Sequence, residues 1–138
     1  MGEGKGFSVL QARRGGRDAI ILVDTALDPS RLAARFPYLL TLTLPIRNAN
    51  PRGLCDDAES ERLSDLEDGL LAALDPAAYR YAGRITWNGV REVLVYVSDA
   101  EASARRLAAA AATAAPDEAV EVSVEREPGW ETYRKIVR

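Results

Sequence analysis

This 138-residue sequence contains no histidine and only one cysteine, Cys55. Histidine is the side chain best suited to proton transfer near neutral pH, and histidine and cysteine together supply most zinc ligands and many nucleophilic sites. A single cysteine cannot form a disulfide within the chain, and no ligand pair lies near Cys55 in the sequence. We therefore expect no catalytic residue, no metal site and no cofactor, and a reducing, cytoplasmic environment.

The sequence also lacks a long apolar run. No stretch approaches the roughly 18 apolar residues of a membrane-spanning helix, and the start, MGEGKG, lacks the apolar core of a signal peptide. We expect residues 1–6 to be disordered and the protein to make no contact with a membrane. Because 47% of the residues are hydrophobic and 28% are charged, we expect residues 1–138 to form a single globular domain.

Acidic residues are concentrated in one segment. Residues 53–78 contain eight Asp or Glu and one Arg, whereas residues 1–52 contain eight basic and four acidic residues and residues 79–138 contain nine of each. Leucines spaced three and four residues apart predict a helix in the acidic segment, which Asp75-Pro76 is expected to end. The predicted apolar stripe of this helix is Leu63, Leu66, Leu70 and Leu74.

The opposite face of this predicted helix carries Glu61, Asp65 and Asp68. Such a row of carboxylates is most often a solvated helix surface. The alternative is a docking face for a basic protein partner, since opposite charges accelerate association. The sequence leaves both interpretations open.

Hydrophobic patterns predict the order of the elements. From Leu39 onward, alternation and helical periodicity indicate strand, helix, strand, strand, helix and strand. This is the β-α-β-β-α-β order of the ferredoxin-like α+β fold, an antiparallel sheet with its helices on one face. Before it, residues 7–12 and 19–23 flank a glycine-centred turn and predict an N-terminal β-hairpin. The expected strands of the main unit are residues 39–46, 79–87, 90–97 and 119–125, and the expected helices are residues 56–74 and 98–115.

Two local motifs predict boundaries within this order. Asn88-Gly89 best tolerates the positive φ angles of a type I′ turn, so it predicts a two-residue hairpin between the central strands. Ser98 followed by Glu101 is the pattern of a capping box and predicts that Ser98 caps the second helix. The register expected from the hairpin pairs Trp87 with Val90, Ile85 with Glu92, Gly83 with Leu94 and Tyr81 with Tyr96.

The strand at residues 90–97 is apolar on both faces, so something must cover each of them. We expect the C-terminal tail, residues 127–138, to pack on the domain through Trp130 and Tyr133 and to cover the second face. A homodimer whose partner subunit covers that face is the alternative. The apolar row of the second face is Val93, Val95 and Val97.

Few side chains carry candidate chemistry. Glu92 lies in an otherwise apolar row, and buried carboxyl groups can serve as general acids. Pairing with Arg84 or Arg91, or solvation at the strand end beside Asn88-Gly89, is favoured over this role. Arg84 is a candidate anion contact, although a structural ion pair is favoured. Trp130 and Tyr133 are candidates for an aromatic ligand wall, although core packing is favoured. Arg84, Glu92, Trp130 and Tyr133 are therefore candidate ligand contacts only.

Two segments together resemble a known family. Residues 81–99 read YAGRITWNGVREVLVYVSD, and residues 127–133 read EPGWETY. The most specific pieces are Tyr-x-Gly-Arg-x-Thr, Asn-Gly-x-Arg-Glu and Pro-x-Trp-x-x-Tyr. Over nearly its whole length, the sequence is similar to the bacterial proteins of domain of unknown function number 695. This resemblance implies no particular activity.

Function must therefore be inferred from the remaining features. Nucleic-acid binding is not expected, because the net charge is −3 and the predicted helix is acidic. We favour a non-catalytic binding or regulatory module that contacts a protein partner. The alternatives are a small-ligand-binding domain and a carboxylate-dependent hydrolase that works without histidine.

Overall fold

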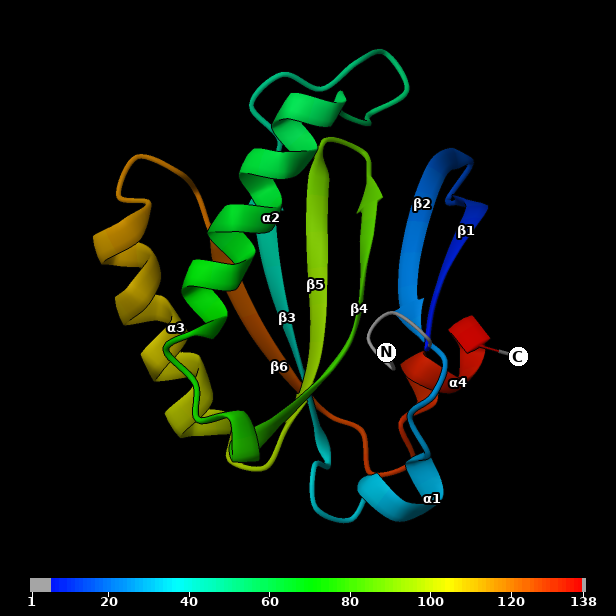
Figure 1. The fold of residues 1–138 in the computed structure, drawn as a ribbon, viewed down its shortest axis with the longest axis vertical. Helices are drawn as coiled ribbons and strands as arrows, with labels where there is room; N and C mark the ends of the chain where they lie inside the picture. Colours follow the sequence, from blue (N-terminus) through cyan, green and yellow to red (C-terminus); the bar gives the residue numbers. More distant parts are fainter. Residues whose placement is uncertain (1–5, 138) are drawn as a thin grey trace.

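The computed structural model describes residues 6–137 (Figure 1). Disorder was expected for residues 1–6, and of these residues only Gly6 lies within the described part. The strands are β1 Phe7–Arg14, β2 Arg17–Asp24, β3 Tyr38–Pro45, β4 Tyr79–Trp87, β5 Val90–Val97 and β6 Glu121–Arg126. The helices are α1 Pro29–Leu32, α2 Asp57–Leu71, α3 Ala100–Ala114 and α4 Glu131–Val137, with a 3₁₀ turn at Pro76–Ala78.

The six strands of the described chain form one antiparallel sheet in the order β1-β2-β4-β5-β3-β6. Strands β3 to β6 and helices α2 and α3 form the predicted β-α-β-β-α-β unit, so the α+β fold is confirmed. The N-terminal hairpin β1-β2 is also confirmed, and it extends the sheet beyond β4. In Figure 1, α2 and α3 lie together over the main unit, whereas the hairpin stands beside them.

Helices α2 and α3 pack on one face of the sheet. Leu63 and Leu70 of α2 and Leu107 of α3 are fully buried there against alternate residues of β3 and β5. Fully burying a leucine side chain stabilises the fold by about 1.5–3 kcal/mol. Leu63 and Leu70 of the predicted stripe thus face the core, and Leu66 is only partly buried at its margin. Leu74 is buried as well, but it lies beyond the end of α2, because the helix ends at Leu71 rather than at Asp75-Pro76. This packing fixes how α2 lies over β4 and β5.

The C-terminal tail forms a second core on the opposite face of the sheet. Trp130 is fully buried and stacks on Tyr96 of β5, with their ring centroids 4.0 Å apart. Its indole Nε1 donates a hydrogen bond to the backbone oxygen of Phe36 at 2.8 Å, which ties the tail to the segment after α1. The Tyr133 hydroxyl donates to the backbone oxygen of Asp24 at 2.6 Å, at the end of β2. The tail therefore ties the end of β2 to the segment that precedes β3.

The sequence assigned the two faces of β5 the wrong way round. The tail does not cover the row of Val93, Val95 and Val97, because that row lies fully buried in the core under α2 and α3. It covers the face of Leu94 and Tyr96 instead. The valine row is therefore not at the surface, and the alternative, a homodimer formed through this row, is wrong for these residues.

A β-bulge changes the predicted register of the β4–β5 hairpin. The pairs nearest the turn are as predicted, but the register shifts between Tyr81 and Gly83. Tyr81 therefore pairs with Val95 rather than with Tyr96, and it joins the core under α2 and α3. A Cβ at Gly83 would collide with the backbone carbonyl oxygen of Leu22 in β2. The close approach of β2 thus accounts for a glycine at the bulge.

The two local motifs differ in outcome. Asn88, with φ of 48°, and Gly89, with φ of 80°, form the predicted tight turn between β4 and β5. The predicted cap of α3 is wrong by one residue, because Asp99 rather than Ser98 accepts a hydrogen bond from the backbone N–H of Ala102 at 3.0 Å. An aspartate is as good an N-cap as a serine, so the sequence offers two competing caps in succession.

Candidate functional site

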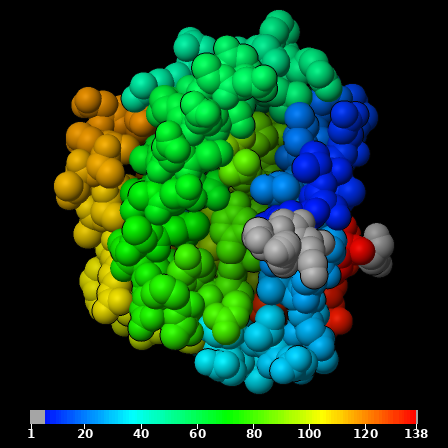
Figure 2. All heavy atoms as spheres, viewed as in Figure 1, coloured from blue at the N-terminus to red at the C-terminus, as the bar shows by residue number. Residues whose placement is uncertain are grey.

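A cavity of about 220 Å³ lies between the β1-β2 hairpin and the N-terminal half of α2. Helices α2 and α3 cover the main unit but not the same face of the hairpin, so that face stays open beside α2. Figure 2 shows the surface hollowed between α2 and the hairpin. The apolar lining comes from Val9, Ile20 and Leu22 of the hairpin and from Leu54 and Cys55 before α2. The polar lining comes from Asp57 and Ser60 of α2 and from Arg84, Thr86 and Arg91 of the sheet.

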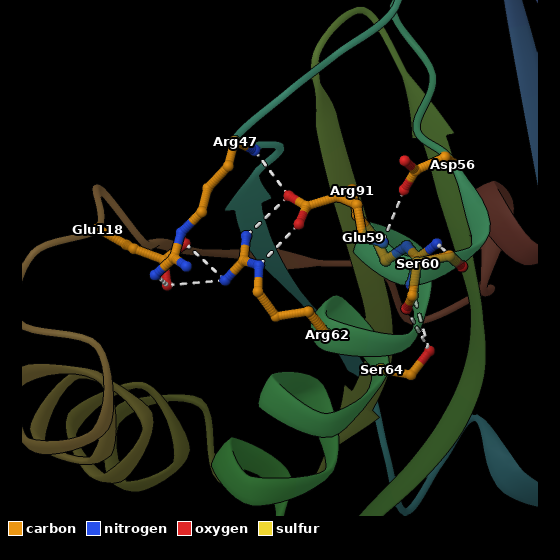
Figure 3. A network of polar contacts seen from close by, with 8 residues as sticks. All are labelled: Arg47, Asp56, Glu59, Ser60, Arg62, Ser64, Arg91 and Glu118. Atoms are coloured by element: carbon orange, nitrogen blue, oxygen red, sulfur yellow. Dashed lines mark hydrogen bonds and ion pairs between the residues drawn. The ribbon is translucent and has the colours of Figure 1, made fainter.

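Arg91 is a buried guanidinium without a carboxylate partner. Only 4% of the residue is exposed, and it donates a hydrogen bond to the hydroxyl oxygen of Thr86 at 3.1 Å. It donates another to the hydroxyl oxygen of Ser60 at 2.9 Å (Figure 3). Among the described residues, no Asp or Glu forms an ion pair with it. Burial, together with the nearby charge of Arg84, lowers the pKa of Arg91. Neutral acceptors alone therefore hold this positive charge.

Arg84 lies next to Arg91 on the same face of the sheet. Its Nη1 donates to the hydroxyl oxygen of Ser64 at 3.1 Å and lies 3.3 Å from a carboxylate oxygen of Glu67. Its Nε and Nη2 donate to no residue of the described chain, and no buried side-chain N or O there lacks a partner, so these nitrogens are accessible. The structural ion pair favoured for Arg84 is thus present, but it uses only part of the guanidinium.

In addition to Thr86 of β4, one face of α2 supplies acceptors for both arginines. Ser60, Ser64 and Glu67 are spaced four and three residues apart, so they lie one above another along the helix. The helix begins where Asp56 accepts a hydrogen bond from the backbone N–H of Glu59 at 2.9 Å. This start sets the rotation of α2 and directs the serine face at β4 and β5.

A second polar cluster anchors the first turns of α2. Glu59 accepts two hydrogen bonds from Arg62, at 2.7 and 2.8 Å, and one from the backbone N–H of Arg47 at 2.7 Å (Figure 3). Arg62 also donates to Glu118 at 3.0 Å. These donors, with the Arg62 guanidinium first, lower the pKa of Glu59 to about 2. The cluster joins the segment at Arg47, helix α2 and the segment at Glu118, and its carboxylates are paired within the protein.

Apart from Asp57, which lines the cavity, the acidic residues of α2 divide into two groups. Glu59 and Glu67 are buried and paired with arginines, as described above. The predicted partner-binding residues Glu61, Asp65 and Asp68 are exposed, and among the described residues none of them forms an ion pair. The exposed row therefore lies on the side of α2 that faces away from the sheet.

Glu92 is not part of the cavity. The interpretation that Arg84 or Arg91 neutralises it is wrong, because its partner is Arg14 at 2.8 Å, from the end of β1. The other carboxylate oxygen of Glu92 accepts a hydrogen bond from the indole Nε1 of Trp87 at 3.2 Å. Register places Glu92 opposite Ile85, on the tail side of the sheet, whereas both arginines face α2.

Trp130 and Tyr133 are core residues and line no open aromatic wall. Trp130 is fully buried, and Tyr133 is only 2% exposed. Beside them, Glu127 accepts a hydrogen bond from the Tyr96 hydroxyl at 2.7 Å and another from Thr132. Of the four candidate ligand contacts, Arg84 alone lies in the cavity described above.

Arg91, Ser60 and Thr86 belong to the cavity, and the sequence reasoning did not single them out as a site. A signal was present, since Arg91 interrupts the apolar strand VREVLVYV and the tight turn places it opposite Thr86. Its burial, however, depends on α2, which lies far away in the sequence. Within residues 6–137, no group of three Cys, Asp or Glu side chains is arranged to hold a metal ion.

Helices α2 and α3 have 15 residues each, and no helix of the described chain combines the length and apolarity needed to cross a membrane. A family model described as "Family of unknown function (DUF695)" matches residues 8–137. Comparisons with curated proteins and with solved structures found no match.

Proposed function

Since the chain belongs to DUF695, a family of unknown function, we propose from its geometry that it is a non-catalytic binding module that contacts a protein partner. The observation that carries the proposal is the exposed row of Glu61, Asp65 and Asp68 on α2. Surface carboxylates without local counter-ions create a negative field that steers a basic partner. Because α2 is anchored at its start by the Glu59 cluster, this row is held on a rigid element.

The competing functions differ in their support. A carboxylate-dependent hydrolase has no observation in its favour, because the buried carboxylates of Glu59, Glu67 and Glu127 all accept hydrogen bonds from other side chains of the chain. A small-ligand-binding function is favoured by the cavity that contains Arg84 and Arg91. The cavity lies on the sheet-facing side of α2, so the two binding functions do not compete for the same surface.

The test of the protein contact is a charge reversal on α2. We expect the double variant Asp65→Lys and Asp68→Lys to retain the wild-type melting temperature and to lose a partner that wild-type protein captures from an extract of the native host. Binding of that partner should weaken as salt rises, because exposed charges are screened over about 8 Å at physiological ionic strength.

The matched control is Glu121→Lys with Glu125→Lys on β6, which changes the net charge equally at other exposed positions. The control should keep the partner. Capture that is equal for the wild type and both variants across the salt series would show that the acidic row is only a solvated surface.

A further inference from the structure

We propose that the cavity between α2 and the hairpin binds a small amphipathic monoanion, whose carboxylate contacts Arg84 and Arg91 and whose apolar body lies on the hairpin. This site uses the sheet-facing side of α2 and goes beyond the protein contact proposed for its exposed side. Three features of the cavity carry the inference: its uncompensated charge, its unused donors and its apolar extension.

The charge of the cavity is uncompensated at its inner end. Of the two arginines, only Arg84 is paired with a carboxylate, that of Glu67, and Arg91 is 96% buried with only neutral acceptors. A buried charge that lacks a counter-ion destabilises the folded protein. An anion that enters this end therefore gains more binding free energy than it would at the surface. Burial raises the pKa of the Cys55 thiol, which keeps this neighbouring group neutral.

The donors that an anion needs are available. The Nε and Nη2 atoms of Arg84 donate to no described residue, and they form the side of a guanidinium that matches a carboxylate with two parallel hydrogen bonds. The Ser60 and Thr86 hydroxyl groups accept from Arg91 and line the same cavity. Because each hydroxyl that accepts from Arg91 still carries its own hydrogen, both groups can donate to an oxyanion in the cavity.

The apolar extension follows from the strand register. Leu22 of β2 pairs with Arg84, and Val9 of β1 pairs with Leu22, so two apolar side chains continue the row from the guanidinium across the hairpin. Neighbouring strands are about 4.8 Å apart, and two spacings therefore give a ligand length of roughly 10 Å. Val9 is 67% exposed and Ile20 is 37% exposed, which leaves these side chains free to contact an apolar chain.

Size and the remaining charge indicate the class of anion. The cavity of about 220 Å³ is smaller than the roughly 300–1,000 Å³ of pockets that bury drug-sized ligands. Asp57 is the one carboxylate that lines it, and it is exposed. Its negative charge disfavours a doubly charged phosphate more than a carboxylate. A short-chain monocarboxylate such as hexanoate satisfies both limits.

The test is a titration of the whole protein with four probes, followed by calorimetry and by methyl NMR. Hexanoate carries both the head group and the apolar body, acetate only the head group, and hexanol only the body, while hexyl phosphate carries the alternative head group. We expect hexanoate to bind most tightly and to shift the methyl resonances of Val9, Ile20 and Leu22. Equal binding of acetate or hexanol, or tighter binding of hexyl phosphate, would overturn the proposed ligand class.

Three variants separate binding at the site from non-specific binding. Arg84→Gln should weaken hexanoate about tenfold or more, because a hydrogen bond to a charged group contributes this much. Arg80→Gln, on the same strand but stacked on Phe36, is the matched control and should bind like the wild type. Val9→Ser should weaken the binding of hexanoate but leave the binding of acetate unchanged. The proposal would be overturned if folded Arg84→Gln bound hexanoate with wild-type affinity, or if methyl resonances shifted only outside the cavity. Either outcome is independent of the result for the protein contact.

Discussion

Gly83 marks the point where β4 bulges and passes closest to β2. A Cβ there would lie 2.9 Å from the Cα of Val23 and would collide with the carbonyl oxygen of Leu22. Both obstacles are backbone atoms of a paired strand, so they cannot move aside without breaking the β2–β4 ladder. We expect Gly83→Ala to lower the free energy of unfolding by about 1–3 kcal/mol, measured by urea denaturation.

The control for this prediction is another glycine of the same chain. Gly69 lies in α2, and a Cβ there would meet no atom within 4 Å. Alanine is the better helix former, so Gly69→Ala should raise the free energy of unfolding by about 0.5–1 kcal/mol. Opposite signs at the two positions are the expected result. Equal effects would mean that steric contact with β2 is not what requires glycine at position 83.

Glu59 should make stability depend on pH. Its folded pKa of about 2 lies below the ordinary 4.5, because Arg62 and the Arg47 backbone stabilise the carboxylate. The stability that this shift contributes is therefore fully present above about pH 4.5 and is lost as the pH falls toward 2. We expect Glu59→Gln to be less stable than the wild type by about 1–3 kcal/mol at pH 6, with the difference shrinking toward pH 2.

Denaturant unfolding at a series of pH values measures this difference. Glu61→Gln, on the exposed side of α2, is the control and should change stability by no more than about 0.5 kcal/mol. A gap between wild type and Glu59→Gln that stays constant from pH 6 to pH 2 would show that the effect of the substitution does not arise from ionisation.

At the level of elements, the cap of α3 provides a direct test. Asp99 accepts a hydrogen bond from the backbone N–H of Ala102, whereas the Ser98 hydroxyl donates to the backbone oxygen of Ala78 at 3.3 Å. We expect Asp99→Ala to cost about 1 kcal/mol and Ser98→Ala clearly less. Thermal unfolding of the two variants checks this order. A larger loss for Ser98→Ala would restore the capping box expected from the sequence.

The turn, the bulge and the helix cap show which local features the sequence could predict. The β4–β5 turn was predictable because Asn88 and Gly89 themselves provide the positive φ angles. The bulge was not, because it depends on the approach of β2 to Gly83, two segments far apart in the sequence. The cap failed for a local reason, since two adjacent residues are both good caps. Short-range chemistry was therefore predictable except where it offered equal alternatives.

In the candidate site, too, local features were predictable and contacts between distant segments were not. Arg84 was a candidate anion contact from its place on a strand, and it does line the cavity. Glu92 was assigned the wrong partner because its ion pair spans 78 residues, to Arg14. Arg91 was recognised only as a partner for Glu92, since its burial arises when Ser60 of α2 packs over β5. Pairings between distant elements could not be read from alternation alone.

At the scale of the whole molecule, one sheet separates two cores. Alternate residues of β5 serve both, with Val95 under α2 and α3 and Tyr96 under the tail. Loss of either layer would expose apolar residues of the same strand. The layer of α2 and α3 and the layer of the tail are therefore expected to depend on each other for stability. The short helices α1 and α4 do not change this expectation, because the shared strand is β5.

This dependence predicts a single unfolding transition. The chain has two tryptophans, and Trp87→Phe leaves Trp130, buried against Tyr96, as the one tryptophan reporter of the tail layer. Far-UV circular dichroism reports mainly on α2 and α3, the longest helices of the described chain. Because β5 is shared, we expect the fluorescence and dichroism midpoints in urea to coincide, as in two-state unfolding. An earlier fluorescence midpoint would mean that the tail detaches while the helical layer stays folded, so that each core is stable without the other.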